Sequence, residues 1–166
     1  MEEKNKETEK KFLIKYPCKE LLCKIGAENR SHIVQTYLIS EENISSRVRM
    51  RIYENVTKYF KTEKKQISDM TCFEDERELT EEEYISELKN ADPDLNPVEK
   101  ERLLIISGKH TFEIDIYPFW QDRAIMEVEL TSEDEEFSVP KGIDIIKDVT
   151  GDARYKNISL AREIPM

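Results

Sequence analysis

Short runs of this chain carry a charged side chain at every second residue, and this alternation limits the possible folds more than any other feature. Residues 47–51 read Arg-Val-Arg-Met-Arg, residues 113–115 read Glu-Ile-Asp, and residues 127–129 read Glu-Val-Glu. A β-strand sends alternate side chains to opposite faces. Each such run therefore predicts a strand with one charged face and one apolar face.

Eight segments rich in β-branched and aromatic residues, separated by turn signals, are predicted to be strands. They span residues 7–15, 32–39, 46–54, 58–66, 71–79, 98–107, 110–117 and 124–131. Residues 54–57 and 107–109 have the composition of hairpin turns. Neighbouring strands are therefore expected to pair antiparallel, in a sheet or a barrel.

Helices are predicted in three places. Thr80 is followed three residues later by Glu83, which is a capping box, and an apolar stripe follows it. Residues 17–24 begin with a proline, which suits a first helical turn. Residues 155–162 form the third predicted helix.

Composition excludes several classes of protein. The 166 residues are 37% charged with a net charge of −10, and a nucleic-acid binder usually has a basic surface. No apolar run approaches the roughly 18 residues of a membrane span. The first six residues lack the apolar stretch of a secretory signal, and three cysteines without CxxC spacing indicate free thiols. We therefore expect a cytoplasmic protein, formed by residues 1–166 as one domain, with neither nucleic-acid nor membrane partners.

The charged strand faces contain both signs at high density. The acids are Glu7, Glu9, Glu76, Glu78, Glu113, Asp115, Glu127 and Glu129, and the bases are Lys11, Arg47, Arg49, Arg51, Lys64, Lys100 and Arg102. In solvent-facing strands such charges would form cross-strand pairs that contribute little. Inside a barrel, two carboxylates about 7 Å apart would repel by roughly 2 kcal/mol, and a hard divalent cation would remove that repulsion. The bases would then need an anion such as a triphosphate, because arginine matches phosphate oxygens.

These runs, in this order, resemble the CYTH domain of the triphosphate tunnel metalloenzymes. Residues 7–14 read ETEKKFLI, which is similar to the ExExK signature that opens the domain. The similarity continues through 35–38 (QTYL), 47–51 (RVRMR), 59–64 (YFKTEK), 76–78 (ERE), 100–102 (KER), 112–116 (FEIDI), 127–129 (EVE) and 149–157 (VTGDARYKN). The resemblance implies a mainly β (α+β) fold: an eight-stranded antiparallel closed barrel, the tunnel, with a few helices packed outside.

The resemblance also implies roles for individual residues. Metal ligands for Mg²⁺ or Mn²⁺ would be Glu7, Glu9, Asp115, Glu127 and Glu129. Phosphate would be bound by Lys11, Arg49, Arg51, Lys64, Lys100, Arg102 and Arg154. Lys100 would help to activate water or protonate the leaving phosphate, and Glu76 and Glu78 would complete the positioning of metal or water.

The chain departs from the family pattern in the middle strands. Glu74 stands where many members have an arginine, and Leu103 stands where an aromatic residue is frequent. Which two of Arg47, Arg49 and Arg51 fill the family's RxR motif is open, although the hairpin that follows favours the later pair.

The predicted function is a metal-dependent triphosphatase that hydrolyses the terminal phosphate of a small-molecule triphosphate. The favoured substrate is inorganic tripolyphosphate, because the sequence shows few groups for a base. Nucleoside or thiamine triphosphatase, class IV-type adenylate cyclase and a non-catalytic polyphosphate-binding module remain as alternatives. The sequence leaves a monomer and a homodimer equally open.

Overall fold

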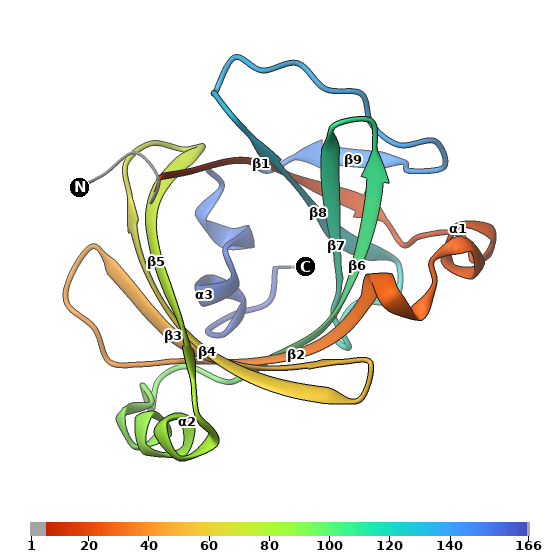
Figure 1. Ribbon diagram of the computed structural model, residues 1–166. Coiled ribbons are helices and arrows are strands. Elements are labelled where there is room, and N and C mark those ends of the chain that lie inside the picture. Colours follow the sequence, from red (N-terminus) through yellow and green to blue (C-terminus); the bar gives the residue numbers. More distant parts are fainter. Residues whose placement is uncertain (1–5, 166) are drawn as a thin grey trace.

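The segments with alternating charge form a closed antiparallel barrel (Figure 1). A computed structural model describes residues 6–165. Its strands are β1 (Lys6–Lys15), β2 (Arg30–Tyr37), β3 (Ile44–Tyr53), β4 (Val56–Gln66), β5 (Thr71–Leu79), β6 (Val98–Ser107), β7 (His110–Ile116), β8 (Arg123–Leu130) and β9 (Ile145–Asp148). The first eight strands confirm the predicted segments and the predicted eight-stranded barrel.

The barrel closes where β1 meets β5. The sheet order is β5-β4-β3-β2-β6-β7-β8-β1, and β5 returns to pair with β1 along Lys6–Thr8 only. Beyond Thr8 the same edge of β1 is free of β5, and β9 pairs there with residues 12–14. The sequence did not predict β9, since its four residues are all exposed and show no alternation of apolar and polar side chains.

Two tight turns fix the register of the hairpins that carry charge. Glu54 and Asn55 connect β3 to β4 with φ values of 46° and 66°, which is the left-handed backbone that two-residue hairpin loops require. Gly108 has φ of 62° in the turn between β6 and β7. Both predicted hairpins are confirmed, and they place Arg47 opposite Thr62 and Arg102 opposite Asp115.

The helices are short. They are α1 (Lys19–Lys24), α2 (Glu81–Glu87) and α3 (Asn157–Leu160), with the 3₁₀ turns η2 (Ala27–Asn29), η3 (Leu88–Asn90) and η4 (Ala153–Tyr155). The capping box at Thr80 and Glu83 is present as predicted. None of the helices within residues 6–165 has the length and apolar character needed to span a membrane.

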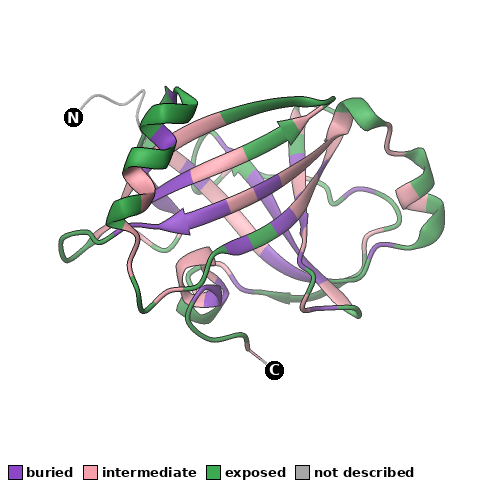
Figure 2. Cartoon of the chain, turned by 90° about the horizontal axis from the view of Figure 1, so that it is seen from below, coloured by how far each residue is buried: buried purple, intermediate pink, exposed green. Residues whose placement is uncertain are grey.

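The C-terminal segment departs from the prediction. Residues 155–162 do not form one helix, and α3 covers only four residues. In Figure 1, α3 lies within the ring of strands, and Figure 2 places the C-terminal segment at one end of the barrel. Its side chains Val149, Tyr155 and Leu160 pack with Leu13 and Ile125 of the barrel wall, so this segment closes an end of the barrel instead of covering its outside.

Apolar side chains of most strands pack against segments that lie outside the barrel. Figure 2 shows buried, intermediate and exposed residues following one another along the strands. Phe12, Ile114 and Met126 pack under α1 and under residues 131–144, a segment without helix or strand. Val48 and Leu79 pack under α2. With its outer face buried in this way, the barrel can turn charged side chains inward.

Candidate functional site

A cavity of about 540 Å³ lies inside the barrel, and charged side chains dominate its walls. Volumes of this size are typical of small-molecule sites. The acids that line it are Glu7, Glu9, Asp69, Glu74, Glu76, Glu113, Glu127 and Asp152, and the bases are Lys11, Arg47, Arg49, Lys64, Arg102 and Lys156. Eight acids against six bases give the described lining a formal charge of −2.

Most of the charges expected to share one lumen do line this cavity. Ten of the fifteen same-face residues lie in its walls. The remaining five are Glu78, Asp115, Glu129, Arg51 and Lys100, and Arg154 is also absent from the lining.

The residues outside the cavity fall into two groups. Arg51, Glu78, Glu129 and Arg154 are exposed: Arg51 stacks over a tyrosine ring at 5.7 Å, and Arg154 pairs with Asp152 at 2.7 Å. Lys100 and Asp115 are instead buried beneath the lining, at 1% exposure each. For all six residues, the roles in binding metal, phosphate or water that the sequence predicts stay predictions.

The buried pair beneath the lining holds an arginine of the cavity wall in place. Asp115 accepts a hydrogen bond from Lys100 Nζ at 2.9 Å, and it accepts two from Arg102, through Nε at 2.8 Å and Nη2 at 2.9 Å. Burial alone would raise the pKa of Asp115, but the charges of Arg102 and Lys100 hold it well below its usual range. Burial lowers the pKa of Lys100 to about 7. Asp115 thus has both oxygens engaged, and Arg102 has a fixed position.

Arg47 and Arg49 form a second basic feature, which we call the arginine pair. Arg47 is 7% exposed, and within residues 6–165 no carboxylate forms an ion pair with it. Its Nε and that of Arg49 lack hydrogen-bond partners within that range, and Arg49 has one partner, Glu76 at 3.3 Å. Burial and the neighbouring charge of Arg47 lower the pKa of Arg49 to about 10. Burial opposes the charge of Arg47, but Tyr37 and the charge of Glu74 more than offset it, so the pKa of Arg47 is raised. An anion with several oxygens would satisfy the unpaired Nε and give Arg47 the ion pair that the described residues do not supply.

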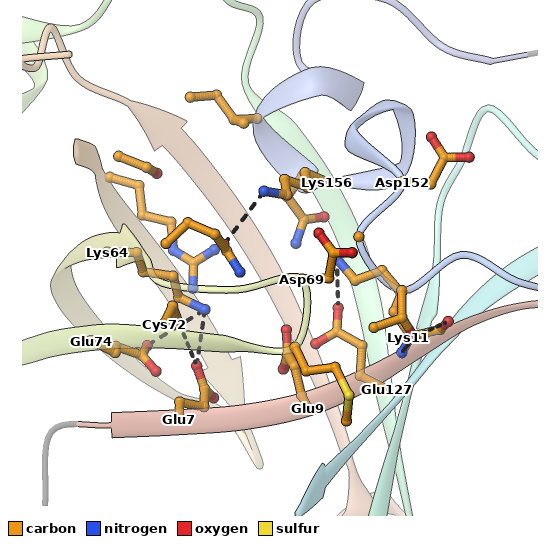
Figure 3. Close-up of a pocket in the computed structure, with 18 of the residues that line it drawn as sticks. Glu7, Glu9, Lys11, Lys64, Asp69, Cys72, Glu74, Glu127, Asp152 and Lys156 are labelled. Carbon is orange, nitrogen blue, oxygen red and sulfur yellow. Dashed lines mark hydrogen bonds and ion pairs between the residues drawn. The ribbon is translucent and has the colours of Figure 1, made fainter. Parts of the chain in front are cut away.

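The β1 side of the cavity presents carboxylates. Figure 3 shows Glu127 beside Lys11, Glu7 and Glu74 beside Lys64, and Glu9 between these two groups. Lys11 Nζ lies 3.4 Å from Oε1 of Glu127. Burial opposes ionisation of Glu127, yet the Lys11 charge holds its pKa at about 2. Burial and the Glu127 charge raise the pKa of Glu9 well above its usual value.

These carboxylates have the chemistry of a site for a hard divalent cation. Oxygen donors are what Mg²⁺ and Mn²⁺ prefer, and a cation near Glu9 and Glu127 would relieve the repulsion that raises the pKa of Glu9. In this structure no three His, Cys, Asp or Glu side chains of the described residues converge as a preformed metal centre. Lys11 and Lys64 provide the local positive charge instead. The carboxylates are donors of the kind that Mg²⁺ or Mn²⁺ prefers, and Lys11 and Lys64 would have to move before such a cation could bind among them.

The C-terminal segment forms part of the cavity wall. Thr150 accepts a hydrogen bond from the backbone of Lys11 at 3.0 Å, and Lys156 Nζ donates to Gln66 Oε1 at 3.4 Å. Gly151 has φ of 78° and approaches the side chain of Asp69 so closely that a Cβ atom would lie 2.5 Å from it. This segment therefore reaches from β1 to the end of β4 along one side of the cavity.

Asp69 and Asp152 of the lining carry no strand-face signal in the sequence, and two strand residues of the lining have more weight in the structure than in the sequence. Sequence reasoning favoured Arg49 and Arg51, whereas the structure places Arg47 and Arg49 in the cavity. It noted Glu74 as a departure from the family pattern and assigned it no role. The signal was present in both cases, because Arg47 and Glu74 share the strand face of Arg49 and Glu76 respectively.

Two of the three cysteines lie outside the site. All three are free, and Cys18 and Cys23 are exposed. Cys72 is buried and lines the cavity, with its Sγ 3.7 Å from Oε2 of Glu7. Burial raises the pKa of the Cys72 thiol to about 11, so it is a protonated part of the wall and not a nucleophile.

Solved structures with the same fold are known. The inorganic triphosphatase NE1496 is 28% identical, with a TM-score of 0.57 over 96% of this chain and 97% of that one. The PH1819 protein from Pyrococcus horikoshii is 20% identical, with a TM-score of 0.58 over 77% and 80% of the two chains. A Bacillus halodurans protein provisionally assigned as an adenylate cyclase is 17% identical, with a TM-score of 0.56 over 78% and 83%.

The likeness to the second and third of these proteins concerns the fold alone. No protein-family model and no curated protein sequence matches the chain. The likeness to NE1496 extends over nearly the full length of both chains.

Proposed function

We propose that this chain, which has the CYTH or triphosphate tunnel domain, is a phosphohydrolase that removes the terminal phosphate of a triphosphate with the help of Mg²⁺ or Mn²⁺. The similar protein NE1496 is an inorganic triphosphatase, and its fold covers almost all of this chain. The observation that carries the proposal is the arginine pair: Arg47 is buried in the cavity wall without a carboxylate partner among the described residues.

The charge of the lining supports a dependence on divalent cations. A triphosphate carries about four negative charges, and the described lining already has a formal charge of −2. The triphosphate and the lining would therefore repel each other unless positive charge were added between them. Bound Mg²⁺ or Mn²⁺ would neutralise phosphate oxygens and lower the pKa of a water molecule.

One side of the cavity would bind the cation, and the opposite side would bind the phosphates. Glu7, Glu9 and Glu127 would hold the cation on the β1 side. Arg47 and Arg49 would bind the triphosphate across from them and stabilise the charge that develops on the transferred phosphoryl group.

The buried Lys100 and Asp115 would fix Arg102 in the cavity wall. Nη1 of Arg102 lies 2.8 Å from Glu113 and would exchange that contact for one with the same anion. Since Lys100 is 1% exposed and lies beneath the lining, we assign it a positioning role and not contact with the substrate. Lys11 would exchange its contact with Glu127 for one with phosphate when a cation occupies the β1 side.

Inorganic tripolyphosphate is the substrate that the lining favours. Tyr37 is the sole aromatic side chain among the described residues that line the cavity. Its hydroxyl accepts a hydrogen bond from Gln35 at 3.0 Å, which restricts the ring. The described lining also contains the apolar side chains Ile44, Met70, Val149 and Ile158, but it offers a nucleoside or thiamine triphosphate no second ring on which to stack.

Phosphate release tests this function directly. Tripolyphosphate, ATP and thiamine triphosphate should each be incubated with the protein in Mg²⁺, Mn²⁺ or EDTA, and phosphate, pyrophosphate and cyclic nucleotide should be measured. We expect phosphate from tripolyphosphate in either metal and none in EDTA. Tight binding of tripolyphosphate without turnover in any metal would leave a binding module and exclude the enzyme.

Glu127→Gln tests the assignment of the cation side. Removing this carboxylate should abolish turnover, because the remaining acids hold a divalent cation less well. Glu136→Gln is the matched control: it makes the same change on an exposed side chain of the segment 131–144, which is absent from the cavity lining. Equal activity of the two variants would remove Glu127 from the site.

A further inference from the structure

Lys64 is held between two carboxylates inside the cavity, in an arrangement that a phosphate-binding role does not explain. Its Nζ lies 3.2 Å from Oε2 of Glu7 and 3.9 Å from Oε1 of Glu74. The exposed fractions of the three side chains are 26%, 21% and 18%, so water screens these charges only in part. Figure 3 shows the ammonium group between the two acids. Lys64 thus already has more negative charge around it than it can neutralise.

Glu74 lies close to Arg47, the buried arginine that lacks an ion-pair partner among the described residues. Strand β4 sets Lys64 opposite Glu74, and two residues earlier it sets Thr62 between Arg47 and Glu76. Glu74 is therefore a diagonal neighbour of the row that contains Arg47, and its charge helps to raise the pKa of that arginine. Arg47, buried and without an ion-pair partner among the described residues, lines the same cavity and indicates an anionic ligand there.

Two requirements conflict at this point. A polyphosphate that binds Arg47 and extends to Lys64 brings its oxygens toward Glu7 and Glu74, which repel them. A divalent cation held by these two carboxylates would take the place of the ammonium group. Lys64 would then be free to turn toward phosphate, and the repulsion would become attraction.

We propose that Glu74 makes the binding of a polyphosphate anion at Lys64 conditional on a divalent cation. This inference rests on the proposed function, since it concerns the same cavity and the same class of ligand. Glu74 acts here as a positioning residue: it holds Lys64 away from the anion until a cation is present, and it adds an oxygen donor beside Glu7.

Calorimetric titration with tripolyphosphate, in EDTA and in saturating Mg²⁺, tests the proposal. In EDTA, Glu74→Gln should bind tripolyphosphate about tenfold more tightly than the unmodified chain, because Lys64 loses a competing counterion. In Mg²⁺ that gain should disappear or reverse, because the variant also lacks a cation ligand. Glu74→Asp keeps the charge and should behave like the unmodified chain in both conditions.

Asp75→Asn is the matched control. It removes one negative charge from the neighbouring residue of β5, which is exposed and absent from the cavity lining. It should leave both dissociation constants within about twofold, since an exposed charge is well screened. Circular dichroism and thermal unfolding of each variant verify that the barrel is intact.

The outcomes separate this inference from the proposed function. If Glu74→Gln and Asp75→Asn bind alike in EDTA, or if the gain in Glu74→Gln is equally large in Mg²⁺, Glu74 does not couple cation and anion. The proposed function can survive either result. If tripolyphosphate fails to bind the unmodified chain in Mg²⁺, both the proposed function and this inference fail.

Discussion

The buried ion cluster beneath the cavity leads to a sharp prediction about stability. Asp115→Asn removes the one carboxylate that pairs with both Lys100 and Arg102, at 2.9 Å and 2.8 Å. The Lys100 side chain has no exposed surface, and that of Arg102 is 17% exposed. Removing one partner of a buried ion pair costs about 3–5 kcal/mol, because the other charge stays buried without compensation. The amide keeps part of the hydrogen bonding, so we expect a loss of about 3 kcal/mol at pH 7.

The loss should depend on pH in a defined direction. The pKa of Asp115 is lowered in the folded protein, so its contribution is complete above the unfolded value of about 4 and constant at higher pH. The folded pKa of Lys100 is about 7, below its unfolded value, and without Asp115 it should fall further. Just below pH 7 the unmodified chain keeps Lys100 protonated, whereas the variant must still release that proton to fold. The deficit of the variant should therefore be about 1 kcal/mol larger at pH 6 than at pH 8.

Urea unfolding in EDTA at pH 6, 7 and 8 measures both effects. Glu113→Gln is the matched control, because Glu113 pairs with the same arginine at 2.8 Å but has a side chain that is 35% exposed. It should cost less than about 1 kcal/mol. A deficit of Asp115→Asn as small as that of Glu113→Gln, or one that grows with pH, would refute the reasoning.

Two further predictions concern the arginine pair and the helix outside the barrel. Arg47→Met should weaken the binding of tripolyphosphate in Mg²⁺ by about tenfold or more, because it removes a charge-assisted contact. Arg51→Met changes a residue outside the cavity lining and should alter the dissociation constant less than twofold. If calorimetric titration showed the same loss of affinity in both variants, Arg47 would not be the specific phosphate contact. Thr80→Ala should cost about 1 kcal/mol in urea unfolding, since Thr80 accepts the Glu83 backbone hydrogen bond at 3.1 Å in the capping box. Unchanged stability there would mean that α2 contributes little to covering Val48.

The strands were predictable because their signal is local. Alternation of charged and apolar residues is imposed by the pleat of each strand, whatever its neighbours are. The capping box at Thr80 and the hairpin at Glu54 and Asn55 depend likewise on a few adjacent residues. In contrast, β9 forms because β5 leaves part of the edge of β1 unpaired, which is a property of the closed barrel.

The site was predictable as a set of candidates, and its internal arrangement was not. Strand parity alone assigns Arg47, Arg49 and Arg51 to one face, yet Arg51 lies outside the cavity and Arg47 is buried in its wall. Parity likewise treats Asp115 and Glu127 alike, although one is locked beneath Arg102 and the other faces the cavity beside Lys11.

By itself, the sequence determined which side chains share a strand face and therefore which charges could meet inside a barrel. Only the tertiary structure decided which of them meet. Contacts among strands far apart in the chain set how deep each charged side chain lies in the barrel and how far it is from its neighbours. They also set where the C-terminal segment closes the barrel. The pairing of Lys64 with Glu7 and Glu74 joins three such strands, β4, β1 and β5.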